Sequence, residues 1–517
     1  MSKAVEKIVI VGSGCSASIT AAFLARQTFS KIKIVCIEDP KHKDSFFEPA
    51  SDPFFRNFIF SFDFFEANWL LSSGGSYCLA ALYEGFGNLH KRAYLPFDPL
   101  FSASFNGYSL FEHYLAGQLR GQPMQPIFNT APYLCDFNKA PFLPGDAPYF
   151  GASGGNFGYL FDPSLAKQHF RKTAMGLGVD FYSSIVKNFA FNSDGSIKAV
   201  QTKDGDNFEA DFFIDCSGSD GLIVQKALKG PFVEDGNLQG LYYEQECNNA
   251  PLEPYYTQSA MEKGLLLKWP LRNKNIFLYL YEPWRQSENE AKALFKDKDL
   301  QSLHFRLGSL ERPWVKNVLA ISSAAAVFDP RANLQWQHLV KSLEEFIVHF
   351  PLKDKNEQRA LSYNRALYSH VEDAKSFVAA HHITQNKSLP RRLGRIFEDW
   401  KAAVIPRLNF GVLANPLNST DALKIRSLAL FAIQGVLPNQ MPAALRLLEQ
   451  EQIDGLKNLQ ASYEMAARQF PDHREFLQMT EDSLDMTNVD PGFMESKNAY
   501  DSSGIRSQTS VLKNPHD

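Results

Sequence analysis

A glycine-rich turn near the start of the chain contains the first residues whose types and spacing could do chemistry. Gly12, Gly14 and Ala17 form a G-x-G-x-x-A motif between an apolar run at residues 7–11 and a helical pattern. The first glycine allows a tight turn, the second lets a pyrophosphate approach the backbone, and the small third residue lets the helix pack on the strand. The helix N-terminus offers free N–H groups and a partial positive charge to phosphates. The motif therefore predicts a dinucleotide site.

A second apolar run, at residues 32–37, ends on Glu38. Its carboxylate can accept hydrogen bonds from a ribose 2′-OH and would repel a 2′-phosphate. We expect Ser13 and Ser16, which lie in the turn itself, to belong to the same binding site. The alternative is a strand–helix turn that binds nothing, with Glu38 as a solvated loop carboxylate. The motif does not distinguish FAD from NAD.

Composition narrows the class of protein. The chain has 517 residues, is 44% hydrophobic and carries a net charge of −4, so global disorder is excluded and neither nucleic acid nor a membrane surface is an expected partner. It has no run of 18 apolar residues and no signal-peptide pattern, so we expect a cytoplasmic protein. The six cysteines are scattered without a C-x-x-C pair, which favours buried free thiols and no metal site.

Several segments further along the chain have readable patterns. Residues 95–155 are rich in Pro, Gly and Phe and predict a long irregular excursion, which either frames a substrate pocket or is structural filler. Residues 185–212 predict a β-meander. The apolar strand at residues 212–215 runs into a turn of small residues at Ser217 and Gly218. In a doubly wound sheet such a turn faces the cofactor.

Together these elements predict an α/β fold with a Rossmann-like module, a mixed sheet and a mostly helical C-terminal region. We expect the dinucleotide-binding module to span residues 1–335, with inserted substrate-side segments at about 95–155 and 236–300. The helical region then covers residues 336–480, and residues 481–517 form a polar tail.

The order of these motifs resembles that of the flavin-dependent tryptophan halogenases. The strongest local matches are residues 210–218 (ADFFIDCSG), Phe328-Asp329-Pro330 and residues 434–438 (QGVLP). The resemblance implies a module of the flavin monooxygenase/halogenase type, with FAD as cofactor and a separate flavin reductase that supplies its reduced form. In the family, reduced flavin and oxygen convert halide to hypohalous acid, which travels through a tunnel to a lysine beside the aromatic substrate.

The resemblance also implies flavin contacts beyond the N-terminal motif. These positions are Val186, Ser217, Gly218, Ile321, Pro330, Leu334 and Gln335. Only one dinucleotide motif is visible, so we expect no separate NAD(P)H site, which favours an external source of reduced flavin.

Two residues that the family's chemistry requires are missing. The lysine position is Leu79, or Cys78 with a shift of one residue, and no lysine occurs between Lys43 and Lys91. The glutamate two residues after the proline of the flavin turn is Ala332. A leucine can neither carry an active halogen nor polarise hypohalous acid by hydrogen bonding.

Two further family motifs have changed. The Ser-Thr-Gly that holds chloride in the family reads Asn-Leu-Gln at residues 333–335. The family's G-W-x-W-x-I-P motif falls on residues 264–270, where Leu265 and Leu267 replace both tryptophans. With four losses at one site, we do not expect the standard lysine relay.

Three interpretations remain open. The chain could be an FAD-dependent oxidoreductase that uses O2 on a tryptophan-like or indole substrate by another route, as a monooxygenase or an atypical halogenase. It could be a conventional tryptophan halogenase with relocated catalytic groups, or a non-catalytic flavin-binding or partner-binding protein. The expected partners are a small aromatic substrate or a tryptophan-containing peptide, and a flavin reductase. A homodimer is compatible with the sequence.

Three residues are candidates to replace the missing catalytic groups. His381 and His382 lie in the helical region, and histidine is the natural acid–base group near neutral pH. The alternative is a histidine pair on a helix surface or in the core. Lys268 lies within the altered tryptophan motif, where the alternative is a solvated strand face.

Other polar residues have two interpretations each. Arg331 could neutralise a reduced flavin or an anionic substrate, or cap local carbonyl groups. Gln335 and Trp336 could adjoin the flavin ring or pack in the core. An exposed strand end explains Tyr83 and Glu84 without a functional role.

Overall fold

The computed structural model describes most of the chain. The described residues are 3–41, 46–62, 66–86, 91–97, 104–105, 108–122, 124–127, 129–143, 154–247, 251–353, 356–382, 398, 422–435 and 446–487. Residues 436–438 of the QGVLP match and residues 488–517 of the expected polar tail therefore lie outside the described residues.

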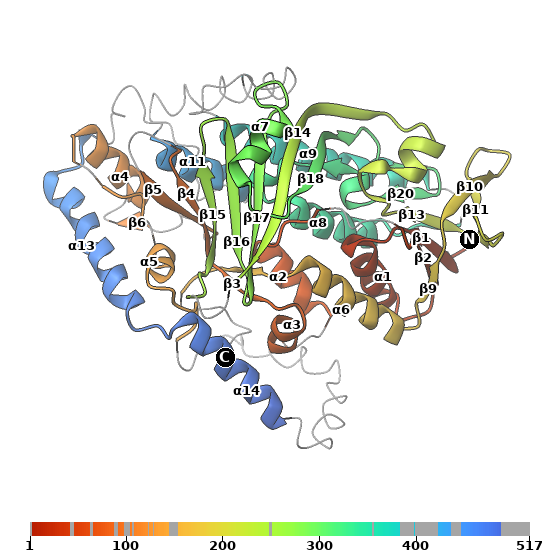
Figure 1. The fold of residues 1–517 in the computed structure, drawn as a ribbon, viewed down its shortest axis with the longest axis horizontal. Coiled ribbons are helices and arrows are strands. Elements are labelled where there is room, and N and C mark those ends of the chain that lie inside the picture. Colours follow the sequence, from red (N-terminus) through yellow and green to blue (C-terminus); the bar gives the residue numbers. More distant parts are fainter. Residues whose placement is uncertain are drawn as a thin grey trace, which may run out of the picture.

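A six-stranded sheet forms around the N-terminal motif (Figure 1). Its strands are parallel except for the edge strand β19, and its order is β19-β20-β13-β1-β2-β9. The bounds are β1 (Lys7–Val11), β2 (Lys33–Glu38), β9 (Asp180–Ser183), β13 (Phe212–Asp215), β19 (Trp314–Val315) and β20 (Val318–Ala320). The predicted strands are confirmed, because continuous apolar runs suit strands buried on both faces.

Two helices pack together beside this sheet, α1 (Cys15–Gln27) and α6 (Pro163–Gly176). Asp162 is the N-cap of helix α6, and its side chain accepts from the N–H of Ser164. Pro163 follows as the first residue of the helix, where its missing N–H costs no hydrogen bond. The predicted meander is confirmed as a three-stranded antiparallel sheet of β10 (Val186–Phe191), β11 (Ile197–Thr202) and β12 (Asn207–Glu209).

An eight-stranded sheet forms the middle of the molecule (Figure 1). Its order is β21-β18-β14-β17-β16-β15-β4-β5, and only β4 and β15 pair in parallel. The bounds are β4 (Ala80–Glu84), β5 (Arg92–Pro96), β14 (Phe232–Glu246), β15 (Tyr255–Ala260), β16 (Gly264–Pro270), β17 (Lys274–Tyr281), β18 (Gln301–Leu310) and β21 (Ala326–Val327). The segment 236–300, expected as an insertion, thus supplies the centre of this sheet.

Four short strands form two small pairs that are not hydrogen-bonded into the main sheets. Strand β3 (Ser76–Cys78) pairs with β8 (Gly158–Leu160), and β6 (Ser104–Phe105) pairs with β7 (Tyr108–Ser109).

The expectation of an irregular segment at residues 95–155 is wrong in part. This segment contains α4 (Leu110–Leu119) and α5 (Ala131–Asp136). Most of α4 is buried, from Leu110 through Gly117 with the exception of Glu112. A helix buried around most of its circumference has no apolar stripe, so its sequence lacks the period that reveals a helix.

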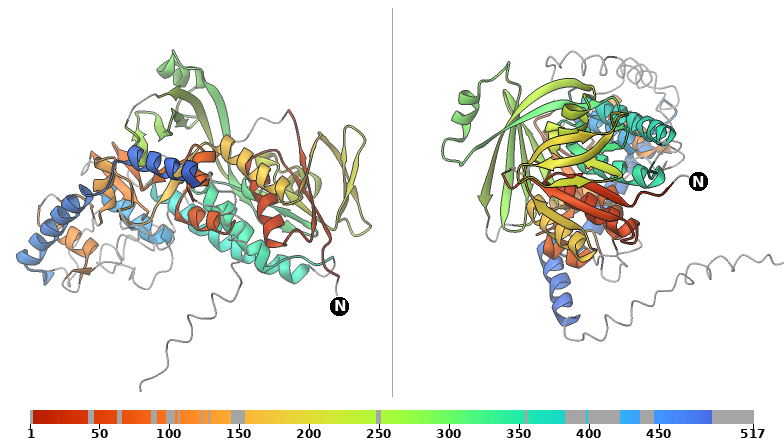
Figure 2. Two further views of the ribbon diagram at one scale, coloured as in Figure 1. Left: turned by 90° about the horizontal axis from the view of Figure 1, so that it is seen from below. Right: turned by 90° about the vertical axis from the view of Figure 1, so that its right-hand side faces the viewer.

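The helical C-terminal region is confirmed for the described residues. It contains α8 (Gln335–Val348), α9 (Glu357–Ala380), α11 (Ala422–Gln434), α13 (Gln450–Ala467) and α14 (His473–Thr487). Figure 2 shows α8 and α9 on one side of the molecule, opposite the green strands of the large sheet and α7 (Glu288–Lys292). Helix α8 also packs on α1, so the division at residue 335 stays a prediction.

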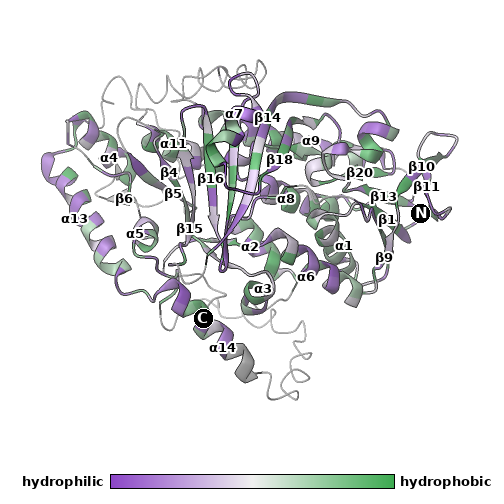
Figure 3. Ribbon diagram, viewed as in Figure 1, coloured by the Kyte–Doolittle hydropathy of each residue, from purple (hydrophilic) through white to green (hydrophobic). Residues whose placement is uncertain are grey.

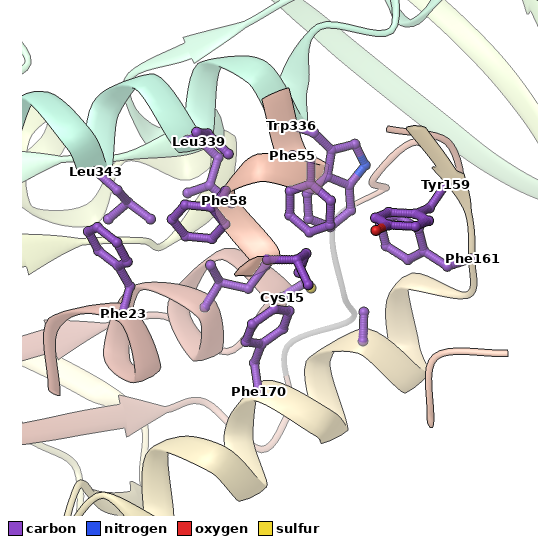
Figure 4. Packing of buried hydrophobic residues seen from close by; sticks show 14 of the residues in the cluster. Cys15, Phe23, Phe55, Phe58, Tyr159, Phe161, Phe170, Trp336, Leu339 and Leu343 are labelled. Carbon is purple, nitrogen blue, oxygen red and sulfur yellow. The ribbon is translucent and has the colours of Figure 1, made fainter. Parts of the chain in front are cut away.

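An aromatic core joins the first half of the chain to α8. Helix α2 (Pro53–Phe60) contributes Phe55 and Phe58, whose rings lie 4.8 Å from Trp336 and 5.0 Å from Phe23, respectively (Figure 4). Helix α3 (Glu66–Ser72) adds Trp69. The hydropathy colours agree with the position of this core, because β1 and α1 carry mainly apolar residues and α14 carries polar ones (Figure 3). This core accounts for part of the unusual phenylalanine content.

The described part of the chain has no helix long and apolar enough to cross a bilayer. It also has no cluster of His, Cys, Asp or Glu suited to a metal ion. The six cysteines are free, and all but Cys247 are buried.

Candidate functional site

Three turns meet at the carboxyl edge of the parallel sheet. They follow Val11, Asp215 and Ala320, which lie side by side in the register of β1, β13 and β20. The contact between the first two turns is close, because a Cβ added to Gly12 would lie 2.2 Å from the carbonyl oxygen of Cys216. Glycine is therefore required at position 12 for packing between turns, whatever is bound.

Gly14 has a different environment. A Cβ there would meet no atom within 4 Å, and helix α1 starts at this residue without a side-chain cap. The first N–H groups of a helix need partners from outside it. The Ser13 hydroxyl already has a partner within the protein, because it accepts from the N–H of Asp39 over 2.7 Å. Ser16 and Ala17 are buried in the first turn of α1.

Glu38 lies at the end of β2, as the motif requires. Its Oε2 is 3.1 Å from Nε of Arg171, which comes from α6 and also lies over the Phe181 ring. Oε1 has no hydrogen-bond partner among the described residues. The N–H of Ser184 donates to the carbonyl of Glu38. This bond brings the chain just before Val186 next to the end of β2.

A cavity of about 460 Å3 opens beside the first turn of α1. Its walls include Cys15, the start of α6 around Lys167, and Tyr242 of β14, together with Phe46, Phe47 and Pro49. Its volume is within the ~300–1,000 Å3 usual for ligand and cofactor sites. We call it the α1 cavity.

The second turn is held by its own side chains. Asp215 accepts from the N–H groups of Ile223 and Val224 at 2.8 and 3.0 Å, and from the Ser217 hydroxyl at 2.5 Å. The Ser217 side chain is thus committed within the turn. Gly218 has φ 72°, and the N–H of Ile321 donates to the carbonyl of Asp215, which connects the third turn to the second.

The turn at Pro330 contains a buried ion pair. Nε of Arg331 donates to both carboxylate oxygens of Asp329 at 2.9 Å. Burial alone would raise the pKa of Asp329, but Arg331 and His382 hold it well below its usual value. Arg331 is therefore paired with its neighbour Asp329 within the turn.

Asn333, in the family's halide motif, has a left-handed backbone with φ 52° and is almost fully buried. Neither polar atom of its side chain has a partner in the described part of the chain. Unpaired buried amides are costly, so the site suits a ligand that offers both a donor and an acceptor. Gln335 is occupied, as its Nε2 donates to the carbonyl of Ala326 over 3.1 Å, and Leu334 is buried.

The two positions at which the resemblance expects catalytic groups are both apolar and enclosed. Leu79 is fully buried between β3 and β4, where its N–H donates to the carbonyl of Pro254 over 2.7 Å. Ala332 is also buried. The tryptophan-motif positions Leu265 and Leu267 point to the same buried face of β16 as Trp269.

The expectation that Tyr83 lies at an exposed strand end is wrong. Tyr83 is buried, and its hydroxyl lies 2.9 Å from Nε2 of His381, whose Nδ1 is 2.9 Å from the carbonyl of Phe377. A neutral His381 that donates through Nδ1 and accepts through Nε2 satisfies both contacts. Burial lowers the pKa of His381 to about 3, which supports the neutral form. Gln258 joins this group to the turn at Pro330 by donating to the carbonyl of Arg331 over 2.8 Å.

The other candidates are separated from one another. His382 is buried with Nε2 3.7 Å from the Asp329 carboxylate, and burial lowers its pKa. Lys268 is on the opposite face of β16 from the core and pairs with Glu253 at 2.5 Å. Glu84 accepts from the Ser259 hydroxyl over 2.8 Å.

Sequence reasoning missed Glu48, whose chain neighbours Phe47 and Pro49 line the α1 cavity. It is almost fully buried, and burial raises its pKa to about 8, with Asp329 acting in the same direction. Its carbonyl accepts from Nε1 of Trp336 over 2.7 Å, so Trp336 belongs to the core. A lone carboxylate within an aromatic segment was the available signal.

Comparison with known proteins gives consistent matches. The family model described as tryptophan halogenase matches residues 7–390. The tryptophan 7-halogenase RebH of Lentzea aerocolonigenes is 25% identical over 413 residues, which cover 74% of this chain and 77% of RebH.

Solved structures agree in fold. The tryptophan 6-halogenase SttH from Streptomyces toxytricini superposes with a TM-score of 0.80 at 20% identity, covering 92% of this chain and 99% of SttH. BrvH, a flavin-dependent halogenase from Brevundimonas sp. BAL3, superposes with a TM-score of 0.79 at 18% identity, with coverage of 92% and 99%.

Proposed function

Because this chain belongs to the tryptophan halogenase family, whose members are enzymes that use FAD reduced by a separate flavin reductase, we propose that it oxidises an aromatic substrate by a route other than the lysine relay. The substrate class we propose is tryptophan-like or indole, free or within a peptide. The observation that carries the proposal is the enclosed hydrocarbon at Leu79, a position that would have to present an amine.

The residues present fit FAD. The open space at Gly14 and the uncapped start of α1 suit a pyrophosphate, and the unpaired Oε1 of Glu38 suits a ribose hydroxyl. The unpartnered amide of Asn333 suits the amide-like edge of a flavin ring. The other positions that the resemblance implies, from Val186 to Gln335, remain proposed contacts. When bound, reduced FAD supplies the electrons that activate dioxygen.

The protein's own groups shape the site around that chemistry. The Asp329–Arg331 pair stabilises the turn that contains Asn333. The Tyr83–His381 pair is connected to the same turn through Gln258, which donates to the Arg331 carbonyl. With its pKa lowered to about 3, His381 is a weak base and not a proton donor at neutral pH. We propose that it is a positioning residue.

One observation favours a second candidate, a halogenase with relocated catalytic groups. Glu48 offers a buried carboxyl between two residues that line the α1 cavity, and Asp329 helps to raise its pKa. With a pKa raised to about 8 it is protonated at neutral pH and could donate a hydrogen bond in place of the missing glutamate at Ala332.

Two measurements test the proposed function. Titration of apoprotein with oxidised and reduced FAD must give saturable binding. A flavin reductase is then coupled to the protein with tryptophan, indole or a tryptophan-containing peptide, and oxygen use is compared with that of free reduced FAD. Oxygen use no faster than that of free reduced FAD on every substrate would favour a non-catalytic protein. The dimer and the cytoplasmic location stay predictions.

A further inference from the structure

A second cavity, of about 190 Å3, lies at the other end of the segment that borders the α1 cavity. Phe47 and Pro49 line the α1 cavity, while Asp52 and Phe54 line the second one, where α2 begins. Helix α11 contributes Arg426 to the walls of this cavity. We call this second space the Arg426 cavity.

Arg426 is only 6% exposed and has an unusual set of contacts. Its guanidinium carbon lies 5.2 Å from the ring centre of Phe97 and 4.8 Å from that of Phe377. It makes no hydrogen bond or ion pair with any described residue, and its Nε is buried without a partner. A buried cation without a hydrogen-bonded anion is strongly unfavourable, so this guanidinium is expected to have an anionic partner from outside the described chain.

Asp52 does not fill that role. Its carboxylate caps α2 by accepting from the N–H of Phe55 over 3.2 Å, and it is not within ion-pair distance of Arg426. Arg426 lowers the pKa of Asp52, but burial dominates and raises it to about 6. The carboxylate is therefore a distant and incomplete counter-charge.

The rest of the cavity indicates what accompanies the anion. Phe54 and Phe97 supply aromatic walls, and Gln337 presents a buried Oε1 that has no partner among the described residues. The volume is below the ~300 Å3 at which pockets for drug-sized ligands begin, so the ligand or its inserted part is small. Aromatic faces beside one fixed cation suit a planar ring that carries a carboxylate.

From this geometry we propose that Arg426 binds the carboxylate of a small aromatic substrate, with the ring between Phe54 and Phe97. The proposal rests on the proposed function, for which it names the substrate class. Phe97, which lines the Arg426 cavity, is linked to Leu79 because its N–H donates to the Leu79 carbonyl.

Calorimetric titration of the flavin-free protein tests the proposal. The probes are indole-3-acetate and benzoate as aromatic carboxylates, indole as the neutral ring, and acetate and chloride as simple anions. We expect saturable binding of an aromatic carboxylate. Arg426→Gln should weaken it by about 10- to 100-fold, the scale of one charge-assisted hydrogen-bonded pair, and should leave indole almost unchanged. Arg426→Lys should retain part of the affinity, because it keeps the charge and loses the planar fork.

Three results would overturn the proposal: no saturable binding of either aromatic carboxylate, equal binding of indole and indole-3-acetate, or displacement by acetate or chloride at the same concentration as the aromatic acids. Arg468→Gln, an exposed change at the C-terminal cap of α13, is the matched control and should bind as the wild type does. FAD titration of the wild type separates the two proposals, because a wild type that binds an aromatic carboxylate but not FAD counts against the proposed function alone.

Discussion

The backbone N–H of Phe97 donates a 3.3 Å hydrogen bond to the carbonyl oxygen of Leu79. The ring centre of Phe97 in turn lies 5.2 Å from the guanidinium carbon of Arg426. Leu79 itself is fully buried. Phe97 thus connects Leu79 to Arg426, whose guanidinium cannot carry a halogen as a neutral amine would.

The first prediction separates the two glycines of the N-terminal motif. Gly12→Ala would place a methyl group 2.2 Å from the Cys216 carbonyl, so we expect a loss of about 1–3 kcal/mol in the free energy of unfolding. Gly14→Ala meets no protein atom and should change stability by less than about 0.5 kcal/mol, yet weaken FAD binding. Urea unfolding and FAD titration of both variants check this. Equal FAD affinity in wild type and Gly14→Ala would count against a phosphate at this turn.

The second prediction concerns the relay position. Leu79→Lys places an ammonium group in an apolar interior, and we expect it to reduce the free energy of unfolding by about 3–5 kcal/mol without restoring halogenation. Leu79→Met is the matched control and should cost less than about 1.5 kcal/mol. Urea unfolding measures both. A lysine variant as stable as the methionine variant would show that position 79 is open to solvent or to an anion.

The third prediction concerns the buried ion pair in the turn at Pro330. Arg331→Met leaves the Asp329 carboxylate buried without its partner, and a loss of about 3–5 kcal/mol is expected. The double variant Asp329→Asn with Arg331→Met should recover part of that loss, because the buried charge is gone. A double-mutant cycle in thermal unfolding gives the coupling energy. Independent, additive effects would mean that the two groups do not stabilise each other.

The fourth prediction uses the raised pKa of Glu48. Its pKa is about 8 in the folded protein against an ordinary value of 4.5, so the folded state binds more protons between these values. Stability therefore falls as pH rises from about 4.5 to about 8. Glu48→Gln removes this contribution, so the variant should gain stability relative to wild type as pH increases. Unfolding at pH 5 and pH 8 measures the difference, and a gap that does not change with pH would contradict it.

The sequence was informative wherever the structure depends on local pattern. The strand–turn–helix around Gly12 and the strand that ends at Asp215 follow from continuous apolar runs and small residues, so they could be predicted. The burial of Tyr83 depends on His381, nearly 300 positions away, and no local pattern encodes that contact. The isolation of Arg426 likewise becomes visible only once α11 packs on Phe97 and Phe377.

The most direct measurement is product analysis by mass spectrometry in a reductase-coupled reaction run with chloride, with bromide and with neither. Under the proposed function, FAD-dependent oxygen use yields a product whose mass rises by one oxygen atom and whose amount does not depend on halide. Free tryptophan should stay unhalogenated. Chloro- or bromotryptophan that forms only when the matching halide is present would contradict the claim that this site works without its lysine.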